Sequence, residues 1–309
     1  MSRPELRRTR CALCLTEGNA TEIYASSFDP EALTPLVFSA RRAPDRIHSR
    51  IVRCNSCGLL RSDPVVAPEI LEDLYAKSSF DYAGELANLR FTYGRLLARA
   101  LPEIGTPQRL LEIGCGNGFF LEEALAQGFQ SVKGVEPSRC AAEEASDHIH
   151  PHLTVSSMRP GLFEPGQFDV VCMFHVLDHL PDPGALLDEC HRLLRPGGLI
   201  ICVAHDATAL SAKLLGERSP IVDIEHTYLF SRGTATKLFS AHGFEVRSAG
   251  SLHNRYSAAY LAHLFPIPAG VKRLLLAILR WTMLGRVPVT LQLGNFHLLG
   301  RKPESLSPG

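Results

Sequence analysis

The chain has 309 residues, 45% of them hydrophobic, which suits one large domain with a small appended domain or two modest domains. Lys plus Arg and Asp plus Glu both number 32, so the near-zero net charge gives no global electrostatic case for binding nucleic acid or an anionic membrane. The N-terminal sequence lacks the apolar segment of a secretory signal, and no apolar run reaches the roughly 18 residues that a spanning helix needs. Nine cysteines without an export signal indicate a reducing compartment. We therefore expect a cytoplasmic protein.

Two C-x-x-C pairs lie near the start of the chain. Cys11 and Cys14 form the first pair, and Cys54 and Cys57 follow after a gap of 39 residues. Each pair can present two thiolates to one metal from a tight turn, and two pairs complete a tetrahedral zinc site with no open position for a substrate. We expect a structural zinc-binding module over residues 1–66. The alternative is four unrelated buried cysteines.

Residues 67–104 are expected to form a helical linker. Apolar residues recur at helical spacing in two segments, the second of which contains Leu86 and Leu89. Phe80 and Tyr82 lie between these segments. They could form a lid over a ligand site, or they could simply close a helix corner.

A glycine-rich stretch organises the rest of the chain. A short apolar run leads into Gly114, Gly116 and Gly118, and then into a helical pattern. This pattern predicts a buried strand, a tight turn and a helix N-terminus, and glycines at that spacing let a ligand approach the backbone closely. Glu112 precedes the turn and favours an ammonium group over a phosphate as the ligand. Glu136, at the end of the next strand, is placed to accept the hydroxyls of a ribose.

Strands and helices alternate regularly after this turn, which predicts an α/β fold with a mainly parallel sheet and helices on both faces. The further strands are expected at residues 132–136, 153–157, 168–174, 199–204, 244–249 and 288–301. The segment 168–174 is apolar apart from Asp169 and should be central in the sheet.

A helical insertion is expected at residues 252–287, between the last two strands. Its segment 270–286 is strongly apolar and carries lysine and arginine at its edges. Such a segment could touch a membrane surface as a peripheral contact. The more ordinary alternatives are a helix that caps the active site and a helix that buries a dimer face, so the oligomeric state stays open.

Four motifs carry a family resemblance, and they span roughly residues 110–203 in the order ExIGCGNG, VEPS, FDVVxxxHVLDHLPDP and LRPGGLIIC. They resemble the Rossmann-like S-adenosylmethionine-dependent methyltransferases. The resemblance implies a seven-stranded, mostly parallel sheet with an antiparallel last strand, in a methyltransferase domain over residues 105–309. It also implies the residues that bind the cofactor. These are Glu112, Gly114, Cys115, Gly116, Gly118, Glu136, Pro137, Ser157, Met158 and Phe174.

Two other stretches bear on this resemblance. The family commonly has an aspartate near the adenine at the end of the third strand, where this chain has Ser156, Ser157 and Met158 instead. The N-terminal phrase RCNSCGLLRSDP resembles methyltransferases that act on sugar nucleotides and carry a four-cysteine zinc module before the cofactor domain.

Histidines supply the candidate bases, because the unperturbed pKa of histidine lies near neutrality. Glu225 and His226, in IEHTYLFS, resemble a pair in sugar-modifying members of the family whose histidine is positioned for proton abstraction. His226 is the first candidate, with Glu225 assisting, and His179 or His205 is the reserve. A structural role at a helix start is the alternative for His226.

The loop after the fourth strand contains His175, Asp178 and His179. Two histidines four residues apart suggest a metal site, but the sequence shows no third clear ligand. The resemblance favours packing of His179 beneath the loop.

We therefore expect methyl transfer from S-adenosylmethionine to an oxygen or carbon atom of a small polar metabolite, with a sugar nucleotide as the acceptor that the resemblance favours. One alternative is an RNA methyltransferase with a zinc module, since residues 1–62 hold ten arginines and six acidic residues. No aromatic-rich basic stretch offers a stacking platform, so no nucleic acid partner is expected. The other alternative is a cofactor-binding protein that does not methylate.

Overall fold

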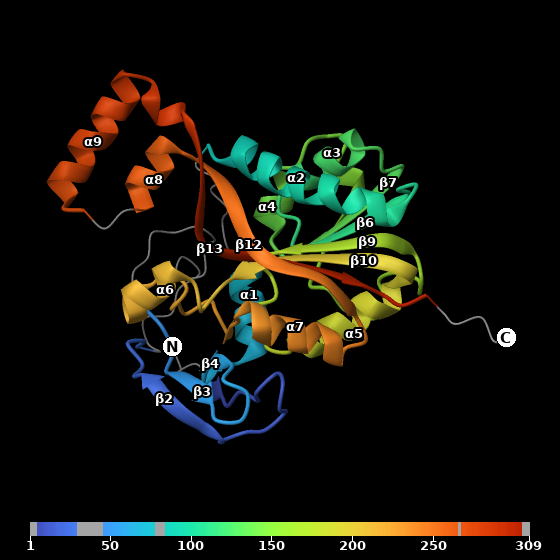
Figure 1. The fold of residues 1–309 in the computed structure, drawn as a ribbon, viewed down its shortest axis with the longest axis horizontal. Helices are drawn as coiled ribbons and strands as arrows, with labels where there is room; N and C mark the ends of the chain where they lie inside the picture. Colours follow the sequence, from blue (N-terminus) through green and yellow to red (C-terminus); the bar gives the residue numbers. More distant parts are fainter. Residues whose placement is uncertain (1–4, 30–45, 78–83, 265–266, 305–309) are drawn as a thin grey trace.

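The computed structural model describes residues 5–29, 46–77, 84–264 and 267–304 (Figure 1). Its main sheet has seven strands in the spatial order β12-β13-β10-β9-β6-β7-β8. In chain order these are β6 (Arg109–Ile113), β7 (Ser131–Glu136), β8 (Leu153–Val155), β9 (Phe168–Phe174), β10 (Leu194–His205), β12 (Glu245–Ser257) and β13 (Pro288–Arg301). Strands β6 to β10 are parallel, and β13 is antiparallel to β10 and β12. The predicted α/β sheet with an antiparallel last strand is confirmed.

Helices cover both faces of this sheet (Figure 1). The helices on one face are α2 (Leu86–Ile104), α3 (Phe119–Ala126) and α4 (Arg139–Glu143), and those on the other are α5 (Pro183–Leu193) and α7 (Arg232–Ala241). Every residue of β9 is buried, and its side chains alternate between the two faces. Val170 packs in the core beneath α2 and α3, whereas Val171 packs in the core beneath α5 and α7. The segment expected as the central strand therefore lies between two hydrophobic cores.

Helix α2 belongs to the layer that covers the sheet. Leu89, Tyr93 and Leu97 are buried in the same core as Phe120 of α3. The preceding helix of the expected linker is α1 (Pro68–Ala76). The expected lid residues Phe80 and Tyr82 lie outside the described residues.

The N-terminal module has a small sheet of its own, which a later segment of the chain completes. Its strands are β2 (Ala20–Tyr24), β3 (Ile51–Cys54), β4 (Leu60–Ser62) and β11 (Tyr228–Leu229), in the spatial order β11-β4-β3-β2. A second ribbon pairs β1 (Leu6–Arg7) with β5 (Val65–Val66). Because β11 follows β10 in the chain, the module and the main domain share a sheet.

The insertion before the last strand is shorter than expected. Strand β12 stays paired with β13 up to Ser257, opposite Pro288, so the two strands continue as a ribbon beyond the end of β10. The helices α8 (Ala258–Leu264) and α9 (Ala269–Trp281) and the short η5 (Leu284–Arg286) then form a lobe that stands away from the main sheet (Figure 1).

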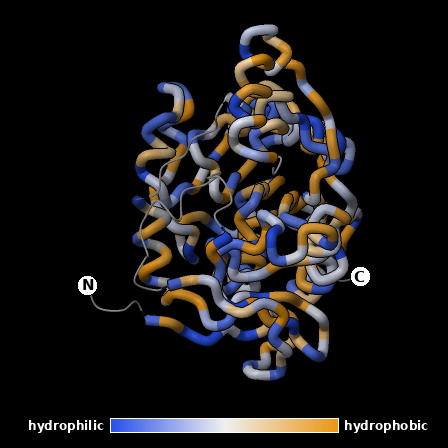
Figure 2. The backbone as a smooth tube through the Cα atoms, turned by 90° about the vertical axis from the view of Figure 1, so that its left-hand side faces the viewer, coloured by the Kyte–Doolittle hydropathy of each residue, from blue (hydrophilic) through white to orange (hydrophobic). Residues whose placement is uncertain are grey.

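In Figure 2, short hydrophobic stretches alternate with hydrophilic ones along the described chain. Among the described residues, no helix is both long enough and apolar enough to cross a membrane.

Candidate active site

The glycine-rich turn joins β6 to α3. Gly114, Gly116 and Gly118 all have left-handed backbone conformations, with φ of 71°, 54° and 74°. A Cβ atom added to Gly114 would lie 2.6 Å from Cγ2 of Val176. The turn therefore needs glycine for both its conformation and its packing.

Two buried carboxyl groups flank this turn. Glu136 Oε2 accepts a hydrogen bond from the Gly116 amide at 2.8 Å, and its Oε1 accepts one from the Ser138 amide at 2.8 Å. A carboxylate has about four lone pairs, so two stay available for hydroxyl donors. Oε2 of Glu112 is buried and has no hydrogen-bond partner among the described residues. Burial and the nearby Glu136 raise the pKa of Glu112 well above its ordinary value. Such a group fits a cationic or hydrogen-bonding ligand that reaches the turn.

The ten residues predicted to bind a cofactor all lie at the carboxyl ends of β6, β7, β8 and β9. Phe174 is stacked on Tyr93 with ring centroids 4.2 Å apart, and its ring is edge-on to Phe120 at 4.7 Å. Ser157 and Met158 follow β8 and are half-buried. Ligands of open parallel sheets bind outside this edge, so the predicted residues share one binding region.

The predicted histidines meet around one carboxylate, that of Asp178. His205 Nδ1 donates a hydrogen bond to Asp178 Oδ2 at 2.7 Å. His226 Nε2 lies 3.8 Å from the same oxygen, and His179 Nε2 lies 3.8 Å from Asp178 Oδ1. The ring of His226 is 4.7 Å from that of His179 and 4.9 Å from that of His205. The three histidines named from the sequence therefore form one cluster.

The electrostatics of this cluster favour a charged Asp178 beside neutral rings of His179 and His226. Burial alone would raise the pKa of Asp178, but the hydrogen bond from His205 and the charges of the surrounding histidines hold it well below its ordinary value. Burial lowers the pKa of His179 to about 3 and also lowers that of His226. At neutral pH the cluster therefore carries a buried negative charge beside the neutral imidazoles of His179 and His226.

The ring and the backbone of His226 are each held by a hydrogen bond. The ring nitrogen Nδ1 of His226 lies 2.9 Å from the carbonyl oxygen of Ile221, and the carbonyl oxygen of His226 accepts a hydrogen bond from Ser62 Oγ at 2.7 Å. Since Nδ1 must donate to that carbonyl, the neutral ring keeps its lone pair on Nε2. The adjacent Glu225 is tied through its backbone amide to Asp223 Oδ1 at 3.1 Å.

Two overlapping sets of side chains bring potential metal ligands within 4.8 Å of one another. One set is His175, Asp178 and His205, and the other is Asp178, His179 and His226. The third ligand that the sequence did not show is therefore present in space. No role of its own was predicted for Asp178 from the sequence. Its position between two histidines in HVLDH was the feature that could have indicated one.

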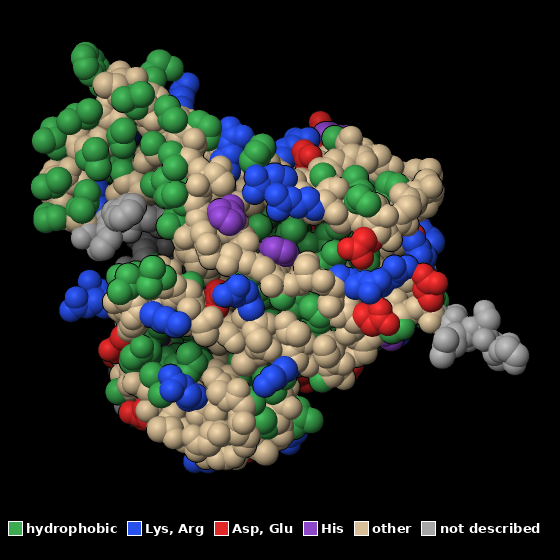
Figure 3. Space-filling view, in the orientation of Figure 1, with side chains coloured by type: hydrophobic (Ala, Val, Ile, Leu, Met, Phe, Trp, Pro, Cys, Tyr) green, Lys and Arg blue, Asp and Glu red, His purple; other side chains and the backbone are tan. Residues whose placement is uncertain are grey.

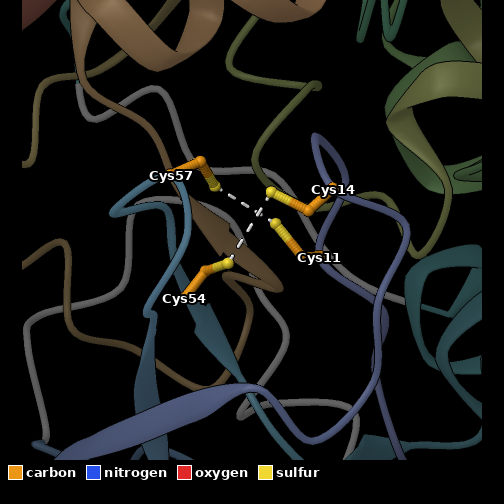
Figure 4. Close-up of side chains that lie close together, drawn as sticks. All are labelled: Cys11, Cys14, Cys54 and Cys57. Carbon is orange, nitrogen blue, oxygen red and sulfur yellow. Dashed lines mark hydrogen bonds between the residues drawn. The ribbon is translucent and has the colours of Figure 1, made fainter.

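The four cysteines of the N-terminal module also come together (Figure 4). Their side chains point toward a common centre, and the four sulfur atoms lie within 4.8 Å of one another. Cys11 Sγ is 3.4 Å from Cys57 Sγ, and Cys54 Sγ is 3.8 Å from Cys14 Sγ. A tetrahedral zinc ion with Zn–S bonds of about 2.3 Å has sulfur–sulfur distances of about 3.8 Å. The donor set and its spacing therefore fit zinc.

Comparison with known proteins gives one family and several partial relatives. A family model described as "Methyltransferase domain" matches residues 86–249, slightly more than half of the chain. A protein named "Ubiquinone biosynthesis O-methyltransferase" from Pseudomonas aeruginosa (strain LESB58) is 37% identical over 101 residues, which are 30% of this chain and 42% of the relative. The protein of the same name from Thiobacillus denitrificans is 34% identical over 99 residues, 30% of this chain and 42% of the relative. The match spans less than half of the length of these relatives.

Among solved structures, a putative methyltransferase from Bacillus halodurans is 18% identical, with a TM-score of 0.48 over 67% of this chain and 98% of the other. Geranyl diphosphate C-methyltransferase from Streptomyces coelicolor is 17% identical, with a TM-score of 0.49 over 76% of this chain and 86% of the other.

Proposed function

Because this chain belongs to the S-adenosylmethionine-dependent methyltransferases, we propose that it transfers the methyl group of that cofactor to an oxygen or carbon atom of a small polar acceptor. The observation that carries the proposal is the pair of His205 and Asp178 at the same edge of the sheet as the glycine turn. Bound S-adenosylmethionine supplies a methyl group on a positively charged sulfur, which is already activated for transfer. The protein has to orient the acceptor and remove its proton.

The cofactor would lie over Gly114, Gly116 and Gly118, where a side chain would block the approach of a ligand. Glu136 has lone pairs available for the two ribose hydroxyls. The unsatisfied Glu112 oxygen supports an ammonium group near the turn.

Exposure and hydrogen bonding favour His205 as the group that accepts the proton. Its side chain is 30% exposed, whereas that of His226 is 8% exposed. Because Nδ1 of His205 donates to Asp178, the neutral ring keeps its lone pair on Nε2, where an acceptor hydroxyl can reach it. Asp178 fixes the tautomer and stabilises the imidazolium that forms. His179 and His226 pack against Asp178 from its other sides and shield it from solvent.

We also propose that Cys11, Cys14, Cys54 and Cys57 hold one structural zinc ion. Four sulfur ligands leave no open coordination position, so this ion would take no part in the chemistry. Its effect would reach the active site through β4, which pairs with β11 next to the His226 loop.

The acceptor is proposed at the level of chemical class. The curated relatives are named as O-methyltransferases, which supports an oxygen nucleophile. The likeness of the four-cysteine module to that of sugar-nucleotide methyltransferases makes sugar nucleotides the first acceptors to test, with phenols as the second class.

The test begins with isothermal titration of the full chain with S-adenosylmethionine and S-adenosylhomocysteine, and with a metal assay on the same sample. We expect micromolar binding and one zinc ion per chain. Acceptors are then screened by formation of S-adenosylhomocysteine, first with sugar nucleotides and then with phenols. A folded, zinc-loaded chain that binds neither cofactor would contradict the proposed function, and binding without product from any acceptor would favour a non-methylating role.

A further inference from the structure

Helix α9 presents an apolar stripe to solvent. Val271, Leu274, Ile278 and Trp281 recur at helical spacing, and their exposed fractions are 56%, 64%, 48% and 87%. Residues at this spacing lie on one face of a helix. The stripe is therefore a continuous surface and not a set of scattered apolar side chains.

The exposed apolar surface continues beyond the helix. Met283, Leu284 and Val287 follow α9 and are also exposed. In Figure 3, hydrophobic side chains gather over this part of the molecule, which is the lobe of α8 and α9 in Figure 1. The opposite side of α9 packs on α8 and on η5. The lobe thus has its own internal packing, and no other part of the described chain covers the stripe.

The charge of this region has a single sign. The 58 residues between Glu245 and Glu304 contain eight lysines and arginines and no aspartate or glutamate. Four of the basic residues, Lys272, Arg273, Arg280 and Arg286, lie in the lobe, where Lys272 Nζ donates a hydrogen bond to the carbonyl oxygen of His263. An exposed apolar stripe on a helix that carries basic and no acidic residues is the pattern of a helix that lies in the interface of an anionic membrane.

We propose that the lobe of α8 and α9, residues 258–287, docks on the surface of a membrane that contains anionic lipids. The side chains of Val271, Leu274, Ile278 and Trp281 would enter the region between headgroups and acyl chains. The arginines beside them would contact lipid phosphates. A second copy of the chain suits this surface less well, because a symmetric dimer would bring two all-basic lobes together.

The chain contains its own reporter for this contact. Trp281 is its only tryptophan and is 87% exposed, so its fluorescence reports directly on the environment of the stripe. The full chain is titrated with vesicles of phosphatidylcholine alone and with vesicles that also contain phosphatidylglycerol. We expect a shift of the emission maximum to shorter wavelength, and co-sedimentation, with the anionic vesicles only.

Matched variants separate the apolar and the electrostatic parts. Ile278→Asp should weaken partitioning onto anionic vesicles at least tenfold, because a charge replaces an inserted apolar side chain. Arg280→Gln should weaken it about fivefold, the effect of one basic residue near an anionic surface. Leu15→Asp changes a leucine in the N-terminal module that is 71% exposed, against 48% for Ile278, and should leave partitioning unchanged.

Two results would overturn the proposal. The first is fluorescence and sedimentation that do not respond to anionic vesicles, or respond equally to neutral ones. The second is a lipid-free dimer in which Trp281 already emits at short wavelength, since a second copy would then cover the stripe. The assay needs neither cofactor nor acceptor, so its outcome is independent of the proposed methyl transfer.

Discussion

Replacement of Asp178 by asparagine tests the proposed base directly. The carboxylate of Asp178 is buried and accepts the hydrogen bond from His205 Nδ1 at 2.7 Å. Asparagine keeps the shape, but its amide can donate to Nδ1, which moves the ring proton to Nε2 and removes the basic lone pair. General-base catalysis contributes about 10²–10⁴ in rate, so turnover should fall by about that factor.

The same substitution should have a smaller effect on stability. Loss of one hydrogen bond to a charged group costs about 1.5–3 kcal/mol. This is less than the total stability of most domains, about 5–15 kcal/mol, so the variant should still fold. The affinity for S-adenosylmethionine should stay within about twofold, because Asp178 is not among the residues assigned to the cofactor. Single-turnover kinetics, urea denaturation and cofactor titration on one preparation separate these three quantities.

Asp206 offers a matched control at the same sheet edge. Its carboxylate is also buried, but it accepts from the amide of Thr208 and pairs with Arg232 at 3.1 Å. Asp206→Asn should therefore lower stability while changing turnover by no more than about threefold. The combination of Asp178→Asn with His205→Ala should be no slower than either alone, because the two residues act as a unit. Wild-type turnover in Asp178→Asn, or multiplicative losses in the double variant, would refute the assignment.

Three further predictions follow from the geometry. Gly114→Ala should weaken cofactor binding at least about tenfold, because the added Cβ would lie 2.6 Å from Cγ2 of Val176. Gly128→Ala, with φ of 99° and open space around the Cβ, should lower the free energy of unfolding by only about 1 kcal/mol. Calorimetric titration with the cofactor and urea denaturation measure the two effects. Cys54→Ser should lose the zinc ion and should lower both the melting temperature and turnover. Cys140 is exposed, so Cys140→Ser should leave the zinc content, the melting temperature and turnover unchanged. Metal analysis, thermal denaturation and an activity assay measure these three quantities. Burial lowers the pKa of His179 from 6.5 to about 3, so on acidification the unfolded chain binds the proton before the folded chain does. As the pH drops below about 6.5, the free energy of unfolding should therefore decrease by up to about 1.4 kcal/mol per pH unit. His179→Gln should flatten that slope in urea denaturation at about pH 7 and about pH 5.

The parts of the fold that the sequence predicted are those with local causes. The mostly apolar run at 168–174 became the buried β9, and Gly114, Gly116 and Gly118 became a turn in which each glycine has a positive φ. The strand and the turn each depend on residues that are neighbours in the chain. The length of β12 was underestimated because residues 252–257 alternate poorly, and only pairing with β13 keeps them extended.

The cluster around Asp178 shows where prediction from sequence stops. Histidines 179, 205 and 226 could be named as candidates from motifs, but their mutual distances depend on how three loops meet at one sheet edge. Their exposed fractions also come from packing. This is why the motif pointed first to His226, whereas exposure and hydrogen bonding favour His205 as the base.

The contact between the cysteine module and the active site also depends on residues that are far apart in the sequence. Strand β11 has only two residues, and its partner β4 lies more than 160 positions earlier in the chain, so no local pattern could reveal the pairing. Together with the hydrogen bond from Ser62 to the His226 carbonyl, this pairing fixes the loop that packs against Asp178. A closed four-sulfur site has no coordination position for a substrate, so any effect of the proposed zinc ion on catalysis has to act through the position of this loop. Loss of the metal should therefore reduce turnover more than cofactor affinity, because the glycine turn belongs to a separate part of the sheet.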